Sequence, residues 1–453
     1  MTATSSVGAG GGHSFEAPAA EPGLVAAAEF LECLFPAPRN FAVTVGGTTV
    51  LAAAGDPVFT LAIRDAQSIR GLFRPPVETS LGNAFLDGRL NVEGDVCMVF
   101  PVVDACRKAA RSPSAVARLV KLWRALPGRA EMGWQVPREA PALRGGKHTA
   151  ERDRAAIVYH YDLGNDFFQL FLDPRMIYSC AYFRSVDDGL EAAQEYKLDQ
   201  ICRKLRLAPG QRMLDVGCGW GGLLIYAAAN YGVSGVGITL SDRQYELASR
   251  RVAEGGLSDR IEIRIQDYRN LGADTFDKVS SIGMFEHVGR ARMPAYFGSI
   301  REALRPGGLF LNHGISMQAN APKNTFASRL KDPLNYLLVG TSPMTKYVFP
   351  DSELIPLSEV NLVAEQAGLE VRDVENMREH YDLTLRHWIR RLEENEAEAT
   401  RLVGPATYRA WRLYFAASAY RFGIGRINVN QTLLTRPDAG RTDAPLSRAD
   451  LYS

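Results

Sequence analysis

The chain has 453 residues, 46% hydrophobic and 23% charged, which is an ordinary globular composition and a length that predicts two or more domains. Its formal net charge of +1 argues against a nucleic-acid-binding protein, a class that usually carries an excess of basic residues. The six cysteines form no C-x-x-C pair and no apolar run reaches the ~18–20 residues that span a bilayer, so we expect no zinc or other metal site, no disulfide framework and a cytoplasmic protein.

The N-terminal part of the chain divides into three segments of different composition. Residues 1–23 are small, rich in glycine and low in complexity, which predicts a disordered tail and, without a basic start and an apolar core, no secretory signal. Residues 24–126 alternate short apolar runs with turns, as in FAVTV and PVFTLAI, and predict a small α+β domain. Residues 127–149 are rich in Pro and Gly and indicate a linker.

A basic region overlaps the end of the predicted α+β domain. Residues 104–154 hold twelve Lys and Arg against five Asp and Glu. The basic residues include Arg107, Lys108, Arg111, Arg118, Lys121, Arg124 and Arg129. Val116, Leu119, Val120 and Trp123 are spaced for one face of a helix. Two interpretations stay open: a solvated helix face, or a patch that settles on anionic lipid headgroups, where each basic residue contributes about 1 kcal/mol.

The second half of the chain alternates helices and strands. LEAAQEYKLDQICRKLRL is an amphipathic helix that ends before Pro209 and Gly210. The predicted strands that follow are RMLDV, SGVGI, IEIRI, FDKVSSIG and GGLFLNHGI, with helices between them. This rhythm predicts an α/β domain over residues 150–453, with a Rossmann-like, doubly wound parallel sheet.

The stretch LDVGCGWGG, residues 214–222, lies between a predicted strand and a predicted helix. A glycine loop in that position lets backbone amides approach a ligand at the helix N-terminus. Gly217, Gly219 and Gly222 fit the G-x-G-x-x-G pattern of dinucleotide-binding proteins. Gly217, Gly219 and Gly221 fit the G-x-G-x-G pattern of S-adenosylmethionine (SAM) enzymes equally well.

Three further features favour SAM over a dinucleotide. Asp215 precedes the first glycine by two residues, where the amino end of SAM would lie. The second strand ends in Thr239, Leu240 and Ser241 and lacks the acid that a dehydrogenase uses to bind ribose. IRIQDY ends the third strand with Asp267, placed to meet an adenine amino group. The loop therefore predicts a methyltransferase.

An aromatic stretch precedes the glycine loop and needs a separate explanation. Residues 159–183, YHYDLGNDFFQLFLDPRMIYSCAYF, contain eight aromatic residues among 25, in a chain that is 9% aromatic overall. The thiol of Cys180 has no second Cys or His at metal-ligand spacing. The stretch predicts an apolar lobe with a few polar groups beside the cofactor loop.

From Tyr159 to its end the chain resembles the cyclopropane-fatty-acid synthase family, which includes the mycolic acid cyclopropane synthases. The resemblance rests on HYDLGNDFF, YSCAYF, EAAQEYKLDQICRKL, LDVGCGWGGL, GITLSDRQ, QDYR, SIGMFEHVG, KYVFPDSEL and HYDLTLRHW, which occur in the family's order. SLGNAFLDGRLNVEGDV resembles the N-terminal domain of the full-length bacterial branch, which implies a lipid-associated domain over residues 24–126.

The resemblance implies a class I SAM-dependent methyltransferase that acts on the cis double bond of an unsaturated phospholipid acyl chain. The alkene attacks the sulfonium methyl, and the resulting cation loses a proton from the new methyl as a cyclopropane ring closes. A feeble nucleophile has to be held in line and dry, and aromatic faces stabilise a cation by roughly 0.5–2 kcal/mol each. The aromatic stretch suits that chemistry.

The resemblance also carries over individual site residues. A bicarbonate ion as base would be held at Cys180, Glu286, His313, Ile315 through its backbone, and Tyr381. The SAM-binding segments would contain Tyr178, Ser179, Asp215, Gly217, Cys218, Gly219, Trp220, Gly221, Gly222, Thr239, Leu240, Ser241, Gln244, Gln266, Asp267 and Tyr268.

Two departures from the family pattern keep other products open. Ser418 stands where a cysteine near the C-terminus is sometimes counted as catalytic, and the segment 317–346 is longer than expected. A hydride shift in the same cation would give a methylene-branched chain, which implies a reductase partner. A lipid-binding module with a degenerate methyltransferase and a small-amine methyltransferase are disfavoured by the intact acid, histidine and tyrosine set.

The resemblance also implies a setting at the inner membrane surface, with an anionic lipid partner and a homodimer formed through the N-terminal domain.

Overall fold

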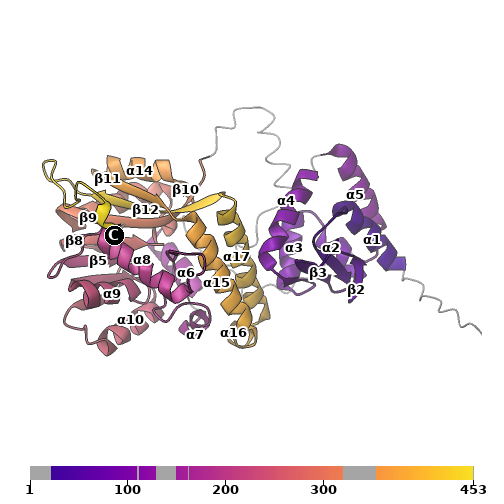
Figure 1. Cartoon of the computed structure of the whole chain (residues 1–453), viewed down its shortest axis with the longest axis horizontal. Helices are drawn as coiled ribbons and strands as arrows, with labels where there is room; N and C mark the ends of the chain where they lie inside the picture. The colour runs from indigo at the N-terminus through magenta and orange to yellow at the C-terminus, as the bar shows by residue number, and fades with distance from the viewer. Residues whose placement is uncertain (1–21, 110–111, 129–148, 162, 320–352, 452–453) are drawn as a thin grey trace, which may run out of the picture. The chain divides into compact units, whose positions relative to one another are not determined.

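The computed structural model describes residues 22–109, 112–128, 149–161, 163–319 and 353–451 (Figure 1). The chain divides into two compact units, one of residues 1–74, 89–95 and 101–132 and one of residues 75–88, 96–100 and 133–453. Most of the predicted tail, linker and long 317–346 segment lies outside the described residues, although residues 22 and 23 begin the first helix.

The first unit contains a four-stranded sheet in the order β2-β1-β3-β4. Its strands are β1 (Ala42–Val45), β2 (Thr48–Leu51), β3 (Phe59–Ile63) and β4 (Leu90–Gly94). A two-residue turn joins β1 to β2, and both of its residues, Gly46 and Gly47, have a positive φ, of 60° and 81°. Glycine adopts that conformation at little cost, and the turn sets the hairpin register. The first unit thus combines helices with a sheet whose strands lie at the expected apolar runs, whereas the bounds 24–126 stay a prediction.

Helices α1 (Pro22–Leu34), α2 (Ala66–Leu72), α4 (Val99–Ala109) and α5 (Pro113–Ala125) accompany this sheet. The expected apolar face of α5 is only partly used, because Val116 and Val120 are 37% and 40% exposed. Trp123 anchors the helix through a hydrogen bond of 2.9 Å from its indole N–H to the carbonyl oxygen of Arg70.

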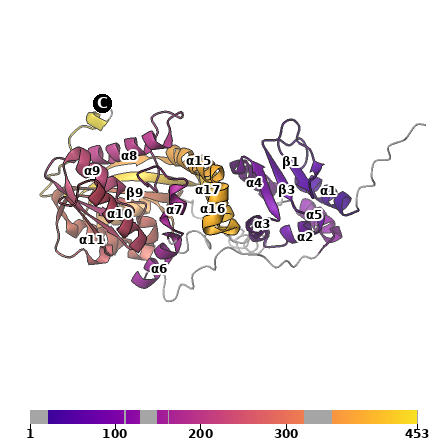
Figure 2. The same cartoon turned by 90° about the horizontal axis from the view of Figure 1, so that it is seen from below.

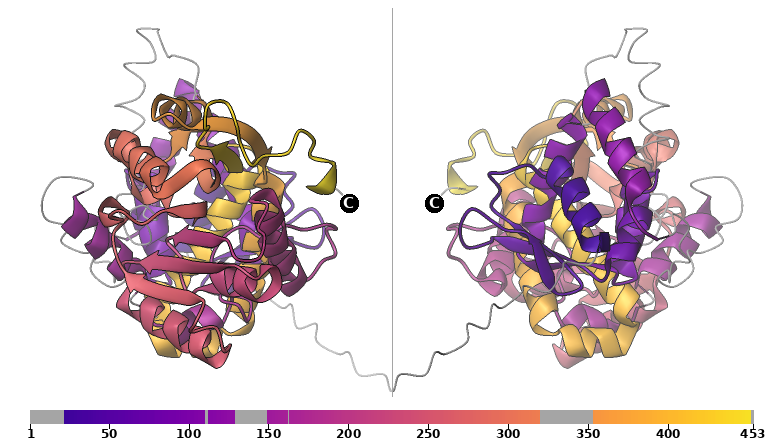
Figure 3. Two further views of the ribbon diagram at one scale, coloured as in Figure 1. Left: turned by 90° about the vertical axis from the view of Figure 1, so that its left-hand side faces the viewer. Right: turned by 90° about the vertical axis from the view of Figure 1, so that its right-hand side faces the viewer.

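The second unit is built on a larger sheet in the order β11-β12-β9-β8-β5-β6-β7. Its strands are β5 (Arg212–Val216), β6 (Ser234–Thr239), β7 (Ile261–Ile265), β8 (Phe276–Ile282), β9 (Leu304–Met317), β11 (Glu370–Asn376) and β12 (Ile427–Thr435), and β10 (Ile355–Pro356) pairs with β9. Neighbouring strands from β7 to β9 are parallel, whereas β12 is antiparallel to β9 and β11 to β12. Strand β12, coloured yellow, is labelled in Figure 1, and Figure 3 shows the yellow C-terminal segment from two further sides.

Helices cover both faces of this sheet, as the doubly wound pattern predicts (Figure 2). Helices α8 (Leu190–Lys204), α9 (Gly222–Tyr231) and α10 (Asp242–Glu254) contribute to one core, with Leu198, Leu224 and Val252 among its buried residues. Helices α11 (Met293–Ala303) and α14 (Leu357–Gln366) contribute to the other, with Ile300 and Val360.

The remaining helices of the second unit lie outside the two helical layers. They are α3 (Val77–Leu86), α6 (Ala150–Tyr161), α7 (Asn165–Gln169), α15 (Arg378–Glu394), α16 (Glu396–Val403) and α17 (Pro405–Gly423). Helices α15 and α17 pack against each other. The chain turns from β5 toward β6 and β7 and later returns to β8 on the other side of β5, so the carboxyl end of β5 is the switch point where ligands bind in such sheets.

Candidate active site

The glycine loop connects β5 to α9 at that switch point. Gly217, Gly219 and Gly221 all have a positive φ, of 79°, 54° and 77°. A Cβ at Gly219 would meet no atom within 4 Å, whereas a Cβ at Gly217 would lie 2.9 Å from Cγ of Met284. The loop is therefore packed at its first glycine and faces open space at its second, which is the arrangement a backbone cradle for a ligand requires.

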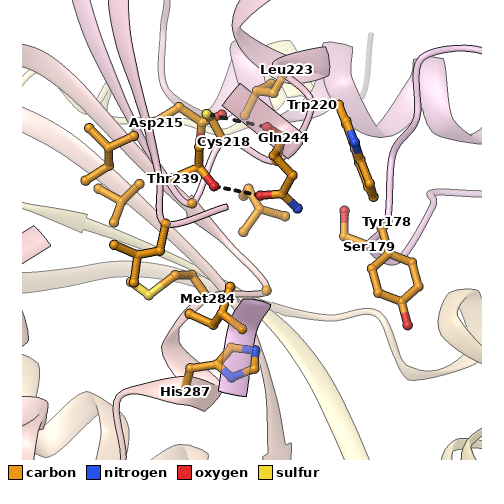
Figure 4. A pocket seen from close by; sticks show the side chains of 18 of the residues that line it. Tyr178, Ser179, Asp215, Cys218, Trp220, Leu223, Thr239, Gln244, Met284 and His287 are labelled. Carbon is orange, nitrogen blue, oxygen red and sulfur yellow. Dashed lines mark hydrogen bonds between the residues drawn. The ribbon is translucent and has the colours of Figure 1, made fainter. Parts of the chain in front are cut away.

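A pocket lies at this end of the sheet (Figure 4). All of the predicted SAM-binding residues line it except Gly221 and Ser241. Gly221 is the N-cap of α9. Ser241 is the N-cap of α10, and its hydroxyl oxygen accepts a hydrogen bond from the backbone N–H of Gln244. These two residues therefore set the direction of the helices beside the pocket. In Figure 4, Tyr178, Ser179 and Trp220 lie along one side of the pocket, with Asp215 and Thr239 on the other.

The polar walls of the pocket are fixed by hydrogen bonds between side chains. Oδ1 of Asp215 accepts a hydrogen bond of 2.6 Å from the hydroxyl of Ser280, and burial raises the pKa of Asp215 to about 6. The hydroxyl of Thr239 donates to Oε1 of Gln244 at 2.7 Å, so the Gln244 amide nitrogen is turned away from Thr239 and can donate elsewhere. The acid, the amide and the open glycine backbone together fit the charged and polar groups of SAM.

Asp267 lines the same pocket, but its carboxylate is already engaged. Oδ1 accepts hydrogen bonds from the backbone and side chain of Arg269 at 2.9 and 2.8 Å, and Oδ2 accepts one from the Arg269 guanidinium at 2.8 Å. Each carboxylate oxygen has two acceptor sites, so an adenine amino group remains a compatible partner. Arg269 fixes the orientation in which Asp267 would meet it.

The five residues expected to hold bicarbonate come from four different parts of the fold. Cys180 lies in the loop after α7, Glu286 in a short 3₁₀ turn after β8, His313 and Ile315 on β9, and Tyr381 on α15. Oε1 of Glu286 accepts a hydrogen bond of 2.7 Å from the amide of Ile315. Burial is the main cause that raises the pKa of Tyr381. Cys180 and Glu286 lie close enough to raise it further.

None of these five residues lines the cofactor pocket, but their neighbours do. Met284, His287 and Val288 flank Glu286, and Tyr178 and Ser179 precede Cys180 in the chain. The expected base site therefore adjoins the pocket through two short segments.

Glu286 is a buried acid with one engaged oxygen. Burial raises its pKa to about 7, although the hydrogen bond from the Ile315 amide favours the charged carboxylate and acts in the opposite direction. Its second oxygen, Oε2, is buried and has no hydrogen-bond partner among the described residues. A carboxyl group with a pKa near neutrality and a vacant oxygen can share a proton with a bound ion or substrate.

His313 is held in a neutral state by its surroundings. Burial lowers its pKa well below the usual value, and the ammonium groups of Lys197 and Lys204 lower it further. Lys204 donates to Oε1 of Gln431 at 2.6 Å, and Nε2 of Gln431 lies 3.2 Å from Nδ1 of His313. Because the oxygen of Gln431 is bound to an ammonium, its NH₂ group faces the imidazole and donates to Nδ1. The proton of neutral His313 therefore sits on Nε2, which is buried without a partner among the described residues.

Cys180 has no feature of a nucleophile. The thiol is fully buried and donates to the carbonyl oxygens of Ala181 and Met377 at 3.2 and 3.7 Å. Burial raises the pKa of Cys180 strongly, so it remains a neutral thiol. The adjacent backbone is tied to α15 by a hydrogen bond of 3.0 Å from the Ala181 amide to Thr384.

Part of the aromatic stretch packs with aromatic side chains of α15 and α17 into a continuous cluster, which we call the aromatic wall. It consists of Phe167, Phe168, Phe171, Tyr178, Trp388, Trp411 and Phe415. Tyr178 joins this wall to the pocket, with its ring centroid 5.1 Å from that of Trp388 and 5.5 Å from that of Phe168. Burial raises the pKa of Tyr414, and the side chains of Ser418 and Tyr178 act against that rise, so the serine at the departure position lies near the end of the wall that meets the pocket.

Some pocket residues were not anticipated from the sequence. Tyr161 lines the pocket together with Gln244, and its position in the aromatic stretch was the available signal. Lys197 also lines it, and its place in the buried stripe of α8, between Ala193 and Ile201, was a signal that went unused. A lysine in an otherwise buried helix face needs a partner or a ligand.

Comparison with known proteins agrees with this geometry. The family described as mycolic acid cyclopropane synthetase matches residues 148–432. A probable fatty acid methyltransferase from Pseudomonas putida is 41% identical over 400 residues, which cover 87% of this chain and 92% of the relative. The cyclopropane-fatty-acyl-phospholipid synthase of Escherichia coli (strain K12) is 39% identical over 288 residues, 63% of this chain and 69% of the relative.

The crystal structure of the mycolic acid cyclopropane synthase CmaA1, complexed with SAH and CTAB, is 32% identical with a TM-score of 0.56, over 62% of this chain and 98% of that chain. The matches contain the glycine loop, the aromatic stretch and the segments around Glu286 and His313. The chain therefore belongs to the mycolic acid cyclopropane synthetase family and is a SAM-dependent methyltransferase with the Rossmann-like class I fold.

Proposed function

We propose that the protein converts the cis double bond of an unsaturated phospholipid acyl chain into a cyclopropane ring. The cofactor supplies its sulfonium methyl group when it is bound. The alkene forms a bond to that carbon as the sulfur–methyl bond breaks, and a cation is left on the neighbouring chain carbon. A proton then leaves the new methyl group, and the freed electron pair closes the ring.

The observation that carries this proposal is the aromatic wall, which meets the cofactor pocket at Tyr178. An alkene needs a dry, closely positioned site because it is a weak nucleophile, and its cation must be kept from water. Aromatic faces stabilise such a cation by roughly 0.5–2 kcal/mol each. A long apolar acyl chain packs favourably against large aromatic side chains, so the wall also suits the chain that carries the double bond.

In this proposal a bicarbonate ion held at Cys180, Glu286, His313, Ile315 and Tyr381 would supply the base. Bicarbonate both donates and accepts hydrogen bonds, and two buried atoms suit it: Oε2 of Glu286 as an acceptor and the Nε2–H of His313 as a donor. The backbone N–H of Ile315 already donates a hydrogen bond to Glu286, so Ile315 would act mainly by orienting that carboxylate. Turnover should fall in buffer stripped of carbon dioxide and return when bicarbonate is added; unchanged turnover would remove the ion from the mechanism.

The substrate would be reached at the inner membrane surface. In the described part of the chain no helix is both long and apolar enough to cross a bilayer. Helix α5 exposes Arg118, Lys121 and Arg124 together with Val116 and Val120. Exposed basic and apolar side chains on one helix suit peripheral binding to anionic phospholipids.

A methylene-branched product is the second candidate, in which a hydride shift precedes loss of a neighbouring proton. The observation in its favour is that the Pseudomonas putida relative, which matches 87% of this chain, is named a probable fatty acid methyltransferase and not a cyclopropane synthase. Such a product would call for a reductase partner to give a mid-chain methyl group.

Proton NMR of lipids from a host with monounsaturated acyl chains, with and without this protein, separates the two products. Both products add one carbon and two hydrogens, so mass cannot distinguish them. High-field ring protons that depend on the protein would support the cyclopropane. Vinylidene protons would support the methylene product, and the absence of both would overturn the proposal.

A further inference from the structure

Lys197 is a fully buried ammonium without a counter-ion in contact. It lies in the middle of α8, is 1% exposed and lines the cofactor pocket. Its Nζ donates one hydrogen bond, of 2.9 Å, to the hydroxyl of Ser179. Among the described residues no carboxylate comes within ion-pair distance of it. A buried cation in this state is costly, so an anionic partner is expected to arrive with a ligand.

The nearby acid Asp173 does not serve as that partner. Oδ1 of Asp173 accepts the amide of Ile177 at 2.8 Å, and Oδ2 accepts the amide of Arg175 at 2.9 Å. Burial lowers the pKa of Lys197 to about 8, and Asp173, Cys180 and Asp215 act against that decrease. The ammonium is thus still mainly protonated at pH 7.

Asp215 is the complementary charge in the same pocket. It is 3% exposed, and a serine hydroxyl, that of Ser280, binds its carboxylate. Lys197 lowers the pKa of Asp215, yet the two groups do not form an ion pair. Figure 4 shows Ser179, which holds the lysine, on the side of the pocket away from Asp215. The pocket therefore presents two separate, opposite charges, each held by a serine.

An α-amino acid zwitterion is the ligand that matches this pair. We propose that the ammonium of Lys197, with the hydroxyl of Ser179, binds the carboxylate at the methionine end of SAM, while Asp215 binds its amino group. Lys197 is then a cofactor-binding residue that discriminates for the carboxylate. The inference rests on use of SAM and not on which acyl product forms.

The test is calorimetric and needs no turnover. S-adenosylhomocysteine carries the carboxylate, and its decarboxylated analogue keeps the amino group but lacks the carboxylate. The wild-type protein should prefer the first ligand by about 10- to 100-fold, the range expected for a hydrogen bond to a charged group. Lys197→Met should lose that preference, because its affinity for S-adenosylhomocysteine falls while its affinity for the analogue does not.

Lys278→Met is a matched control. Lys278 is also 1% exposed and lies in the same unit, but it pairs with Asp443 and does not line the pocket. This variant should keep the wild-type preference. If Lys197→Met does not fold, Ser179→Ala should reduce the preference in the same direction.

An equal loss of affinity for both ligands in Lys197→Met would overturn the inference and indicate a structural lysine. Unchanged affinity for S-adenosylhomocysteine would overturn it in favour of another anion, such as bicarbonate. Failure of the wild-type protein to bind S-adenosylhomocysteine at all would instead contradict the cofactor assignment itself.

Discussion

The amide of Ile315 donates a hydrogen bond of 2.7 Å to Oε1 of Glu286. This contact joins strand β9 to the 3₁₀ turn after β8 and fixes a buried carboxyl group. One oxygen is thereby used for positioning, and Oε2 is left for chemistry. The role of Glu286 in the proposed mechanism depends on this division.

Replacing Glu286 with Gln should lower turnover by roughly 100-fold or more, the smaller end of the contribution of a positioned acid or base. The Gln carbonyl can still accept the Ile315 amide, so the fold and SAM binding should persist. Turnover of phospholipid and calorimetric binding of S-adenosylhomocysteine check the two parts. Glu262→Gln, on the exposed part of β7, is the matched control. Normal turnover in Glu286→Gln would remove this residue from the base site.

Stability should depend on pH through the same carboxyl group. Its pKa is raised from 4.5 to about 7 on folding, so the folded protein binds this proton more tightly than the unfolded chain does. The stabilisation from protonated Glu286 is therefore complete below pH 4.5 and is lost as the pH rises through about 7. Urea unfolding of the wild type and Glu286→Gln should be measured across that range. The free energy of unfolding of the wild type, relative to that of the variant, should decrease as the pH rises. A constant difference would contradict the raised pKa.

The tautomer of His313 should depend on Gln431. Gln431→Leu removes the donor that faces Nδ1, and we expect a loss of about 10- to 100-fold in activity, the size found when the hydrogen-bond partner of a metal-bound histidine is removed. In the wild type, ¹⁵N NMR should show His313 neutral, with the proton on Nε2. The variant should show a mixture of tautomers and reduced turnover with unchanged S-adenosylhomocysteine binding. A proton on Nδ1 in the wild type would refute the assignment.

The open space at Gly219 should be where the cofactor lies. Gly219→Ala and Gly256→Ala both place a Cβ at a positive φ, 54° and 64°, and neither Cβ meets an atom within 4 Å. Only Gly219 lines the pocket, and Gly256 is exposed in a loop after α10. Both variants should lose similar stability by thermal unfolding, whereas only Gly219→Ala should weaken S-adenosylhomocysteine binding. Equal binding by both would mean that the cofactor does not approach this loop.

Helix α5 should bind anionic vesicles through its exposed basic residues. Changing Arg118, Lys121 and Arg124 to Gln should weaken binding by about 1 kcal/mol per charge and reduce its dependence on salt. Co-sedimentation with vesicles that contain or lack anionic phospholipid, at two salt concentrations, measures both effects. Arg250→Gln, an exposed arginine on α10, is the control. If the triple variant binds vesicles as well as the wild type does, the interpretation of this region as a solvated helix face is favoured.

Local pattern was enough to predict the parts of the site that are close in sequence. The loop from Asp215 to Gly222 was recognisable because a strand, three spaced glycines and a helix follow one another. The alternation of strands and helices likewise predicted the large sheet and its two layers.

Features that depend on long-range pairing could not be predicted in this way. Gln431 contacts His313 only because β12 lies antiparallel beside β9, and no local sequence pattern predicts that pairing. The engagement of the Ile315 amide by Glu286 has the same origin. Helical spacing predicted helix α5 but does not say whether Val116 and Val120 are covered by a partner, and both are exposed.

The most direct test of the account uses purified protein, SAM labelled with ¹³C in its methyl group, and vesicles of phospholipid with cis-monounsaturated acyl chains. We expect the label to appear as a cyclopropane ring CH₂ within the acyl chain and Glu286→Gln to form this product at least about 100-fold more slowly. Label in an exocyclic methylene group would contradict ring closure, and label in the headgroup, or in no lipid, would contradict methyl transfer to the double bond.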